Sequence, residues 1–300
     1  MSEDTVRVAG VRLTHPDRVM YPEQGVTKAD VARYYERVAD RILPHLTDRP
    51  LSLVRCPSGR QKECFYQKHL GDTRPEAVRT VPIQEKSAKR PYSVVDDLEG
   101  LVSLVQIGVL EIHPWGSRTD RLERPDRLIF DLDPGQGTGW NDVVRAARRL
   151  HELLDELGLE SFVKVSGGKG LHVVVPLVRR SEWDDVRSFA KACADLMADE
   201  EPDRYVATMS KEKRKGRIFV DYLRNSRGAT SVATYSTRAR SGAPVSLPVR
   251  WDEIGRLDGG DPWAVGAVSR RLSALRRDPW EEFFDIRQSI TEKMRRAVGV

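Results

Sequence analysis

Runs of apolar residues at two different spacings divide this chain into helices and strands. Thr27 and Asp30 have the spacing of a helix cap, and apolar residues then recur at helical intervals up to Pro44. A second, more apolar helix is predicted over 94–112, followed by a turn-rich stretch over 113–117. The first third of the chain is therefore expected to contribute two amphipathic helices.

The middle of the chain changes to short β-rich runs separated by longer helical patterns. Strands are predicted over 127–133, 162–165, 171–175 and 217–223, and helices over 143–157 and 181–197. A tight turn at 166–170 joins the second and third of these strands. Ser181 is the predicted cap of the helix over 181–197. Residues 241–250 look extended and irregular, and a last helical segment begins near 262. This order predicts an α+β fold with a mostly antiparallel sheet flanked by helices.

The length of 300 residues is consistent with one or two domains. We predict a single domain, 1–300, made of an N-terminal subdomain (1–125), a catalytic core (126–240) and a C-terminal extended segment with a helix (241–300). The longest apolar stretch, 101–110, is shorter than the roughly 18 residues that a membrane span needs. No membrane partner is expected, and an acidic N-terminus without an apolar signal segment favours a cytoplasmic location.

The three cysteines form no CxxC pair, and their odd number favours reduced thiols over a disulfide framework. Cys56, Cys64 and His69 lie near one another in sequence, but their spacing matches no zinc-finger pattern. We therefore expect structural cysteines and no zinc site.

Three aspartates in predicted strands are the strongest candidates for chemistry. Asp131 and Asp133 project from the same face of one strand, and their like charges favour a Mg²⁺ or Mn²⁺ ion between them. Asp221 interrupts an apolar strand, where an unpaired carboxylate is costly to bury. The alternatives are a simple Asp-Pro-Gly turn for the first pair, and an ion pair of Asp221 with Arg217 or Arg224. Together, the three carboxylates favour a two-metal site.

A glycine-rich turn and a basic segment could bind phosphate. The sequence Ser-Gly-Gly-Lys-Gly at 166–170 lets backbone N–H groups approach a phosphate, and Lys169 adds charge, although an ordinary glycine hairpin has the same pattern. Its spacing is not that of a Walker A loop. Segment 204–240 carries a net charge of +8, whereas the whole chain carries +5. This run surrounds Asp221, which favours phosphate contacts over a merely solvated basic face.

Phe65 and Tyr66 alternate with cations in the way that base-stacking surfaces do. Lys62, Lys68 and Arg55 lie close to this pair in the sequence. Packing in the core is the alternative explanation of two adjacent aromatic residues.

Several of these motifs together resemble the archaeo-eukaryotic primase superfamily, and most closely the polymerase domain of bacterial DNA ligase D, which acts in non-homologous end joining. The three central motifs are Asp-Leu-Asp-Pro at 131–134, Ser-Gly-Gly-Lys-Gly-Leu-His at 166–172 and Phe-Val-Asp-Tyr-Leu-Arg-Asn at 219–225. Further similarity lies at 13–22, 65–69, 110–115 and 251–253.

The resemblance implies a role for each matching position. The catalytic metals, Mn²⁺ or Mg²⁺, would be bound by Asp131, Asp133 and Asp221. The incoming nucleoside triphosphate would be held by His113, Ser166, Lys169, His172, Arg224 and Arg238. DNA would be contacted by His15, Arg18 and Lys28 at a downstream 5′-phosphate, and by Phe65 and Tyr66 at the template. Tyr66 stands where relatives commonly carry Phe.

The function implied is two-metal nucleotidyl transfer from a nucleoside triphosphate to a primer 3′-OH, with short gap filling and a preference for ribonucleotides. The implied partners are gapped or broken DNA with a 5′-phosphate, an end-binding Ku protein and a separate DNA ligase, in a nucleoid-associated cytoplasmic setting. A replicative-type primase that starts chains de novo is one alternative. A catalytically silent module that binds DNA ends is another, although the presence of all three aspartates favours an enzyme.

Overall fold

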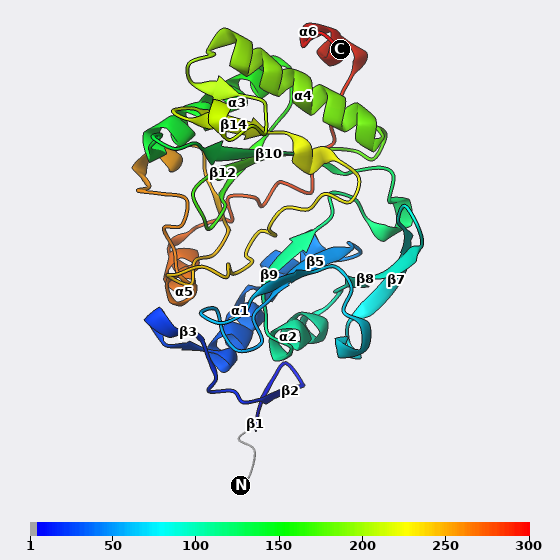
Figure 1. Cartoon of the computed structure of the whole chain (residues 1–300), viewed down its shortest axis with the longest axis vertical. Coiled ribbons are helices and arrows are strands. Elements are labelled where there is room, and N and C mark those ends of the chain that lie inside the picture. Colours follow the sequence, from blue (N-terminus) through cyan, green and yellow to red (C-terminus); the bar gives the residue numbers. More distant parts are fainter. Residues whose placement is uncertain (1–4) are drawn as a thin grey trace. The chain divides into compact units, whose positions relative to one another are not determined.

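The computed structural model describes residues 5–300 and divides them into two compact units, each built from several segments of the chain (Figure 1). The first unit runs through Trp115 and also includes Thr230–Ser246 and Trp263–Leu275. The second unit comprises Gly116–Ala229, Leu247–Pro262 and Arg276–Val300. The borders of these units do not coincide with the boundaries that we predict at 125/126 and 240/241, and the catalytic role of 126–240 stays a prediction.

The first unit contains a five-stranded sheet, two short hairpins and three helices. Its strands are β1 (Thr5–Val8), β2 (Val11–Thr14), β3 (Val19–Tyr21), β4 (Val26–Thr27), β5 (Leu51–Arg55), β6 (Phe65–Gln67), β7 (Arg79–Gln84), β8 (Lys89–Val94) and β9 (Val109–Pro114). Its helices are α1 (Lys28–Leu46), α2 (Leu98–Gln106) and α5 (Val265–Ala274). In the sheet, β6, β5, β8 and β7 are neighbours in that order, and β9 pairs with β5.

Helix α1 begins at the predicted cap, because the Thr27 side chain accepts a hydrogen bond from the backbone of Asp30 and the Asp30 carboxylate binds the backbone of Thr27. The helix continues past Pro44 to Leu46. A proline this close to the end of a helix removes a single backbone hydrogen bond, so it does not stop the last turn.

The predicted helix over 94–112 is wrong at both ends. Helix α2 covers only Leu98–Gln106, and residues 109–114 form strand β9. Gly108 has a φ of 82°, a left-handed conformation that ends the helix and turns the chain into the strand. Leu110 and Ile112 are then buried in a strand that pairs with β5 along most of its length.

The second unit is built on a six-stranded sheet. Its strands are β10 (Arg127–Pro134), β11 (Phe162–Val165), β12 (Leu171–Pro176), β13 (Tyr205–Val206), β14 (Ile218–Asp221) and β15 (Leu247–Val249). Its helices are α3 (Trp140–Glu156), α4 (Trp183–Glu200) and α6 (Glu292–Ala297). The strand order is β13-β14-β10-β12-β11-β15, and all pairs are antiparallel except β13–β14. The predicted α+β architecture with a mostly antiparallel sheet is therefore confirmed.

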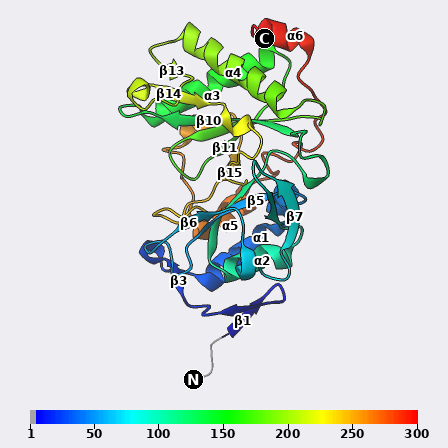
Figure 2. The same ribbon diagram turned by 45° about the vertical axis from the view of Figure 1, so that its right-hand side comes forward.

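The two faces of this sheet have different partners. Helices α3 and α4 contact each other and β10, and they lie on the same side of the sheet in both views (Figures 1 and 2). On the other face, Ile129 and Val174 pack with the aromatic residues Phe162, Trp280 and Phe283. Because strand side chains alternate, Asp131 and Asp133 share the face of Ile129, away from the helices.

Two details of this unit differ from the sequence prediction. Glu182, not Ser181, is the residue before the first turn of α4, and its backbone N–H binds the Asp185 side chain. Part of the stretch predicted as irregular, Leu247–Val249, is strand β15 at the edge of the sheet.

None of the helices in the described part of the chain is long and apolar enough to cross a bilayer.

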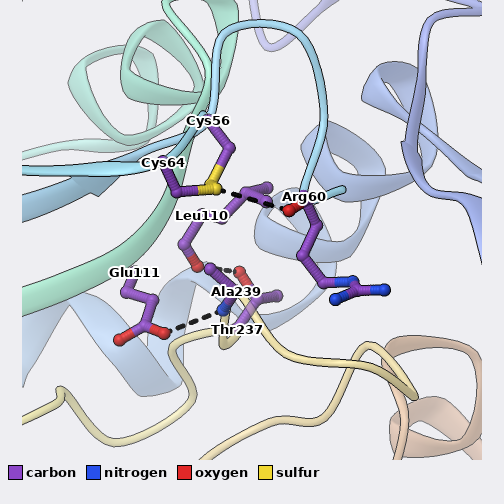
Figure 3. The surroundings of a disulfide bond; sticks show 7 residues. All are labelled: Cys56, Arg60, Cys64, Leu110, Glu111, Thr237 and Ala239. Carbon is purple, nitrogen blue, oxygen red and sulfur yellow. Dashed lines mark hydrogen bonds between the residues drawn. A yellow bond between two sulfur atoms is a disulfide. The ribbon is translucent and has the colours of Figure 1, made fainter. Parts of the chain in front are cut away.

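Cys56 and Cys64 form a disulfide bond, so the expectation of reduced thiols is wrong for this pair (Figure 3). The reason is the register of the β5–β6 hairpin. Arg55 pairs with Phe65, which places the next two residues, Cys56 and Cys64, opposite each other where the strands part. With both sulfurs joined, these cysteines offer no thiolate to a zinc ion. Cys193 is a buried free thiol, as expected.

Candidate active site

The three aspartates come together on neighbouring strands of the second unit. Asp131 on β10 pairs directly with Asp221 on β14, and Asp133 lies two residues further along the same face of β10. One carboxylate oxygen from each residue lies within 4.8 Å of the other two. Asp131 and Asp221 are buried, and Asp133 is half-buried.

Asn225 holds β10 beside the chain that follows β14. Its side-chain oxygen accepts a hydrogen bond from the backbone N–H of Ile129 (2.8 Å), and its amide nitrogen donates to the carbonyl oxygens of Ile129 (2.7 Å) and Tyr222 (2.8 Å). The Asn225 side chain is buried, so it acts as a short strand partner after β14 has ended. This contact fixes the register that places Asp131 opposite Asp221.

Two glycines let the backbone segments around the carboxylates approach closely. A Cβ atom on Gly170 would lie 2.1 Å from the carbonyl oxygen of Leu132, and one on Gly135 would lie 1.8 Å from the carbonyl oxygen of Arg214. Any larger residue would push the β11–β12 turn and the 214–217 segment away from β10. The glycines therefore serve the geometry of the site through close packing.

Arg224 is the main cation beside the carboxylates. Its Nη2 atom lies 3.1 Å from Asp131 Oδ2, and its Nε atom lies 3.4 Å from Asp221 Oδ2. The ion pair that the sequence offered as the alternative for Asp221 is thus present, but one arginine serves two carboxylates of a three-carboxylate cluster.

The pKa values of the cluster reflect this shortage of positive charge. Burial raises the pKa of Asp133 to about 6, and repulsion by Asp131 adds to the shift. Burial also raises the pKa of Asp221, against the attraction of Arg224. Burial disfavours the charged form of Asp131 as well, but His172 and Arg224 outweigh it and lower the pKa of Asp131. Two of the three carboxylates are therefore destabilised as anions, and hard oxygen donors of this kind fit a divalent cation.

This electrostatic arrangement predicts how stability without metal depends on pH. The folded pKa of Asp133, about 6, lies above its ordinary value of 3.8, so the folded state binds more protons than the unfolded state between these values. Asp133 should therefore make the free energy of unfolding fall as pH rises through this window, whereas His172, whose pKa is lowered to about 4, makes it rise over nearly the same range. The comparison of Asp133→Asn with the unchanged chain isolates the Asp133 contribution, and chemical denaturation in EDTA across this range should show a more positive pH slope of the free energy of unfolding for Asp133→Asn. Identical pH slopes would contradict the assigned cause.

His172 lies next to Asp131 on the paired strand β12. Its Nε2 atom is 3.4 Å from Asp131 Oδ1, and burial lowers the pKa of His172 to about 4, so the ring is neutral at neutral pH. The other ring nitrogen, Nδ1, is buried and has no hydrogen-bond partner among residues 5–300. A buried polar atom without a partner needs a ligand or water to satisfy it.

The glycine-rich turn joins β11 to β12 beside this histidine. The backbone N–H groups of Ser166 and Gly167 donate to the carbonyl oxygens of Gly170 and Gly260, at 3.1 and 2.9 Å, and these two amides are already occupied. Ser166 is buried, whereas the Lys169 side chain is exposed. These two amides are therefore unavailable to a phosphate, and Ser166 and Lys169 stay predicted nucleotide contacts of this turn.

His113 and Arg238 belong to the first unit, where Glu111 joins them. Glu111 Oε2 lies 2.8 Å from His113 Nε2 and 3.1 Å from Arg238 Nε. Its Oε1 atom accepts a 2.8 Å hydrogen bond from the backbone of Ala239 (Figure 3). Burial opposes ionisation of Glu111, but His113 and Arg238 outweigh it and lower its pKa to about 2. A single buried carboxylate thus holds two predicted nucleotide-binding side chains.

Sequence reasoning missed Glu111 and Arg214. The Arg214 guanidinium lies 3.7 Å from the centre of the Phe219 ring, and its charge opposes the rise that burial causes in the pKa values of Asp133 and Asp221. Glu111 could have been found by the signal that identified Asp221, because both are acidic residues inside apolar runs. Arg214 lies in a run of cations, where the sequence offers no way to select one.

The residues predicted to bind a 5′-phosphate lie around the start of α1, but the amides of the helix are occupied. The backbone N–H groups of Lys28 and Ala29 donate to the carbonyl oxygens of Arg18 (2.8 Å) and Pro16 (2.9 Å). These two amides are therefore not free to bind a phosphate. Lys28 is buried, and its ammonium donates to the Thr14 carbonyl and to Gln106. Arg18 is half-buried, and His15 is exposed.

Phe65 and Tyr66 are exposed on strand β6, with relative exposures of 37% and 51%. Core packing is therefore excluded as the explanation of this aromatic pair. Arg55 lies 5.6 Å from the centre of the Phe65 ring, and the Tyr66 hydroxyl contacts the Thr230 hydroxyl at 2.9 Å. The pair offers an aromatic surface with a cation beneath it.

Comparison with known proteins found a matching family model and several similar relatives. The family model "LigD, primase-polymerase domain" matches residues 27–280. The chain is 43% identical over 293 residues to the multifunctional non-homologous end joining protein LigD of Pseudomonas aeruginosa. This match covers 97% of this chain and 35% of that protein. It is 35% identical over 250 residues to LigD of Mycolicibacterium smegmatis, and this match covers 83% of this chain and 33% of that protein. The chain thus spans about a third of the length of these relatives.

A solved structure shows the same fold. The polymerase domain of Mycobacterium tuberculosis ligase D, in complex with DNA, superimposes with a TM-score of 0.84 at 31% sequence identity, covering 91% of this chain and 97% of that domain. The family match over most of the chain, the sequence identity and the shared fold all lead to the same assignment. The chain belongs to the LigD primase-polymerase family, as its three motifs predict.

Proposed function

We propose that the chain is a primer-extending nucleotidyltransferase that fills short gaps or extends broken DNA ends and prefers ribonucleotides. The observation that carries this proposal is the carboxylate cluster, in which Asp131, Asp133 and Asp221 place oxygen atoms within 4.8 Å of one another. These residues would hold two divalent cations, Mn²⁺ or Mg²⁺, which supply charge stabilisation for the attacking and leaving oxygens of phosphoryl transfer.

The side chains around the cluster have the chemistry to hold a nucleoside triphosphate. Lys169 is an exposed cation at the tip of the glycine-rich turn, and Arg224 adds a guanidinium beside Asp131. The buried, unpartnered Nδ1 atom of His172 is available to a polar group of the ligand. Ser166 of the same turn, and His113 and Arg238, which Glu111 holds in the first unit, are the other predicted nucleotide contacts.

The test of this function is extension of a labelled primer across a short gap whose downstream strand carries a 5′-phosphate. With Mn²⁺, the chain should add nucleotides, and kcat/KM should be higher for ribonucleotides than for deoxyribonucleotides. Dinucleotide synthesis without a primer would indicate a replicative-type primase instead. Tight binding of DNA ends without any extension would indicate a silent end-binding module.

Arg18→Ala should remove the preference of the chain for a phosphorylated gap. Arg18 is half-buried, and one of its guanidinium nitrogens donates to the Pro57 carbonyl at 2.7 Å, which leaves other donors for a phosphate. Lys28→Ala is a poorer test, because it removes three part-buried hydrogen bonds and would weaken the fold. Competition binding at fixed salt measures the preference, with the exposed Arg37→Ala in α1 as the control. Equal losses on phosphorylated and unphosphorylated gaps would leave Arg18 only a nonspecific role.

Glu111→Gln should weaken nucleotide binding because it removes the charge that holds His113 and Arg238. We expect the half-saturating nucleotide concentration to rise about tenfold, since charge-assisted hydrogen bonds contribute about 1.5–3 kcal/mol. The maximum rate and the affinity for DNA should change little. Glu36→Gln, at an exposed position in α1, is the control. An unchanged half-saturation in a folded Glu111→Gln protein would contradict this positioning role.

We also propose that the DNA partner carries a 5′-phosphate and lies with its template against Phe65 and Tyr66. An end-binding Ku protein, a separate DNA ligase and a nucleoid-associated cytoplasmic location remain predictions of the family resemblance. Co-sedimentation of the purified chain with Ku-bound DNA ends would test the first of these associations.

A further inference from the structure

The second unit contains a pocket at the end of its sheet away from the three aspartates. The pocket has a volume of about 530 Å³, and three segments line it, 118–126, 176–180 and 283–287. On the paired strands β10 and β12, Arg127 pairs with Pro176 at this end, whereas Asp131 pairs with His172 four residues further along. Four residues of a strand span about 13 Å, so the pocket is separate from the proposed metal site.

The pocket is rich in arginine. Five guanidinium side chains line it, and the one acidic residue in its wall is Asp126. The five residues are Arg118, Arg121, Arg179, Arg180 and Arg287. Arg118 pairs with Asp126 at 3.4 Å, and Arg179 pairs with Asp120 at 2.6 Å. Within residues 5–300, the other three form no ion pair with a carboxylate, so the pocket has a surplus of positive charge.

The neighbouring arginines are neutralised by carboxylates, with Arg124 2.8 Å from Glu182 and Arg227 2.8 Å from Glu123. Exposed acidic residues also flank the pocket-lining phenylalanines, at Glu282 and Asp285. A long polyanion such as a DNA backbone needs a continuous row of basic residues. Next to the pocket, ion-paired arginines and acidic side chains interrupt such a row. The charge pattern therefore suits a short anionic segment.

The wall between the arginines is apolar. Phe284 and Ile286 are half-buried, and Phe283 lies beneath them in the aromatic cluster of the sheet. Leu177 and Val178 complete this surface, and their backbone N–H groups already bind the carbonyl oxygens of Asp126 and Gln288 at 2.8 Å. These two backbone donors are thus occupied, whereas an apolar side chain of a ligand would find a complementary surface.

We propose that this pocket docks a short acidic segment of a partner protein that carries an apolar anchor side chain. Aspartate or glutamate side chains of the partner would pair with Arg121, Arg180 and Arg287, and its anchor would pack on Phe284 and Ile286. Arginine and aromatic residues are enriched in the energetic centres of protein interfaces, and arginine clusters recognise acidic motifs. The proposal does not depend on the polymerase activity, because the pocket shares no residue with that site.

The test is fluorescence anisotropy of the full chain with three labelled probes at physiological salt. The first probe is a short peptide of aspartate and glutamate around a central Phe-Leu pair, and the second has Ser-Ser in place of that pair. The third is a thymidine oligonucleotide of the same net charge. We expect the Phe-Leu peptide to bind at least fivefold more tightly than either of the other two.

Arg180→Glu should weaken binding of the Phe-Leu peptide about tenfold or more, because it reverses the charge of an exposed residue in the pocket. Arg121→Glu, also exposed and in the wall, is a second variant of the same kind. Arg187→Glu makes the same charge change at an exposed position of α4 outside the pocket, and it should alter binding less than twofold. All three variants should retain primer extension.

Three outcomes would overturn the proposal. One is no binding of the Phe-Leu peptide at millimolar concentration, and another is equal weakening by Arg180→Glu and Arg187→Glu. The third is tight binding of the oligonucleotide, equal to that of the peptide, together with loss of this binding in Arg121→Glu and Arg180→Glu. That result would make the pocket a nucleic-acid contact.

Discussion

Asp131→Asn should reduce primer extension by at least about a thousandfold, and Asp133→Asn and Asp221→Asn should have similar effects. Each change removes one negative charge from a cluster whose three oxygens lie within 4.8 Å, while it preserves the size of the side chain. A two-metal site depends on all of its carboxylates, because the cations must be bound before they can stabilise charge in the transition state. DNA binding should remain, since it depends mainly on phosphate contacts made elsewhere.

The matched control for this series is Asp203→Asn, at an exposed position of the same unit. Steady-state extension with Mn²⁺ and circular dichroism of each purified protein would separate lost chemistry from lost folding. Near-normal extension by any one of the three variants would remove that residue from the metal site.

Asn225→Ala should lower the free energy of unfolding by about 3 kcal/mol. The substitution leaves the backbone N–H and C=O groups of Ile129 without the partners that Asn225 gives them at 2.8 and 2.7 Å, and Asn225 is buried. Extension should fall as well, because these bonds keep β10 in register beside the chain that follows β14. Denaturant unfolding would measure the stability.

Asn141→Ala, at an exposed position of α3, should change the free energy of unfolding by no more than about 0.5 kcal/mol. If Asn225→Ala were equally harmless, the side chain would not be what joins these segments. The register that opposes Asp131 to Asp221 would then need another explanation.

Local patterns were sufficient to predict the main elements of the second unit. Strand alternation places Asp131 and Asp133 on one face, and strand β10 has that arrangement. What the sequence could not supply is the pairing of β10 with β14, which joins residues ninety positions apart and is decided by packing of the whole sheet. The three-aspartate site therefore needed both a local pattern and a tertiary contact.

The errors have local causes of a different kind. The run from 94 to 112 is apolar enough for one helix, but Gly108 adopts a positive φ and divides it into α2 and β9. The same error explains why Glu111 was missed. A single acidic residue on a helix can face solvent, whereas one in a buried strand needs a partner for its charge. The count of three cysteines favoured reduced thiols, whereas the hairpin register brings Cys56 and Cys64 together. Register is a property of paired strands, and composition carries no record of it.

The most direct test of the central claim is a Mn²⁺ titration followed by electron paramagnetic resonance, in the presence of a non-hydrolysable nucleoside triphosphate. At pH 7.5, the chain should remove free Mn²⁺ from solution in excess of the nucleotide alone, and Asp131→Asn should abolish that excess. Binding should weaken at pH 5, because the pKa of Asp133 is raised to about 6 and protons then compete with the metal. Equal Mn²⁺ binding by the unchanged chain and by Asp131→Asn would contradict the metal centre proposed for the three aspartates.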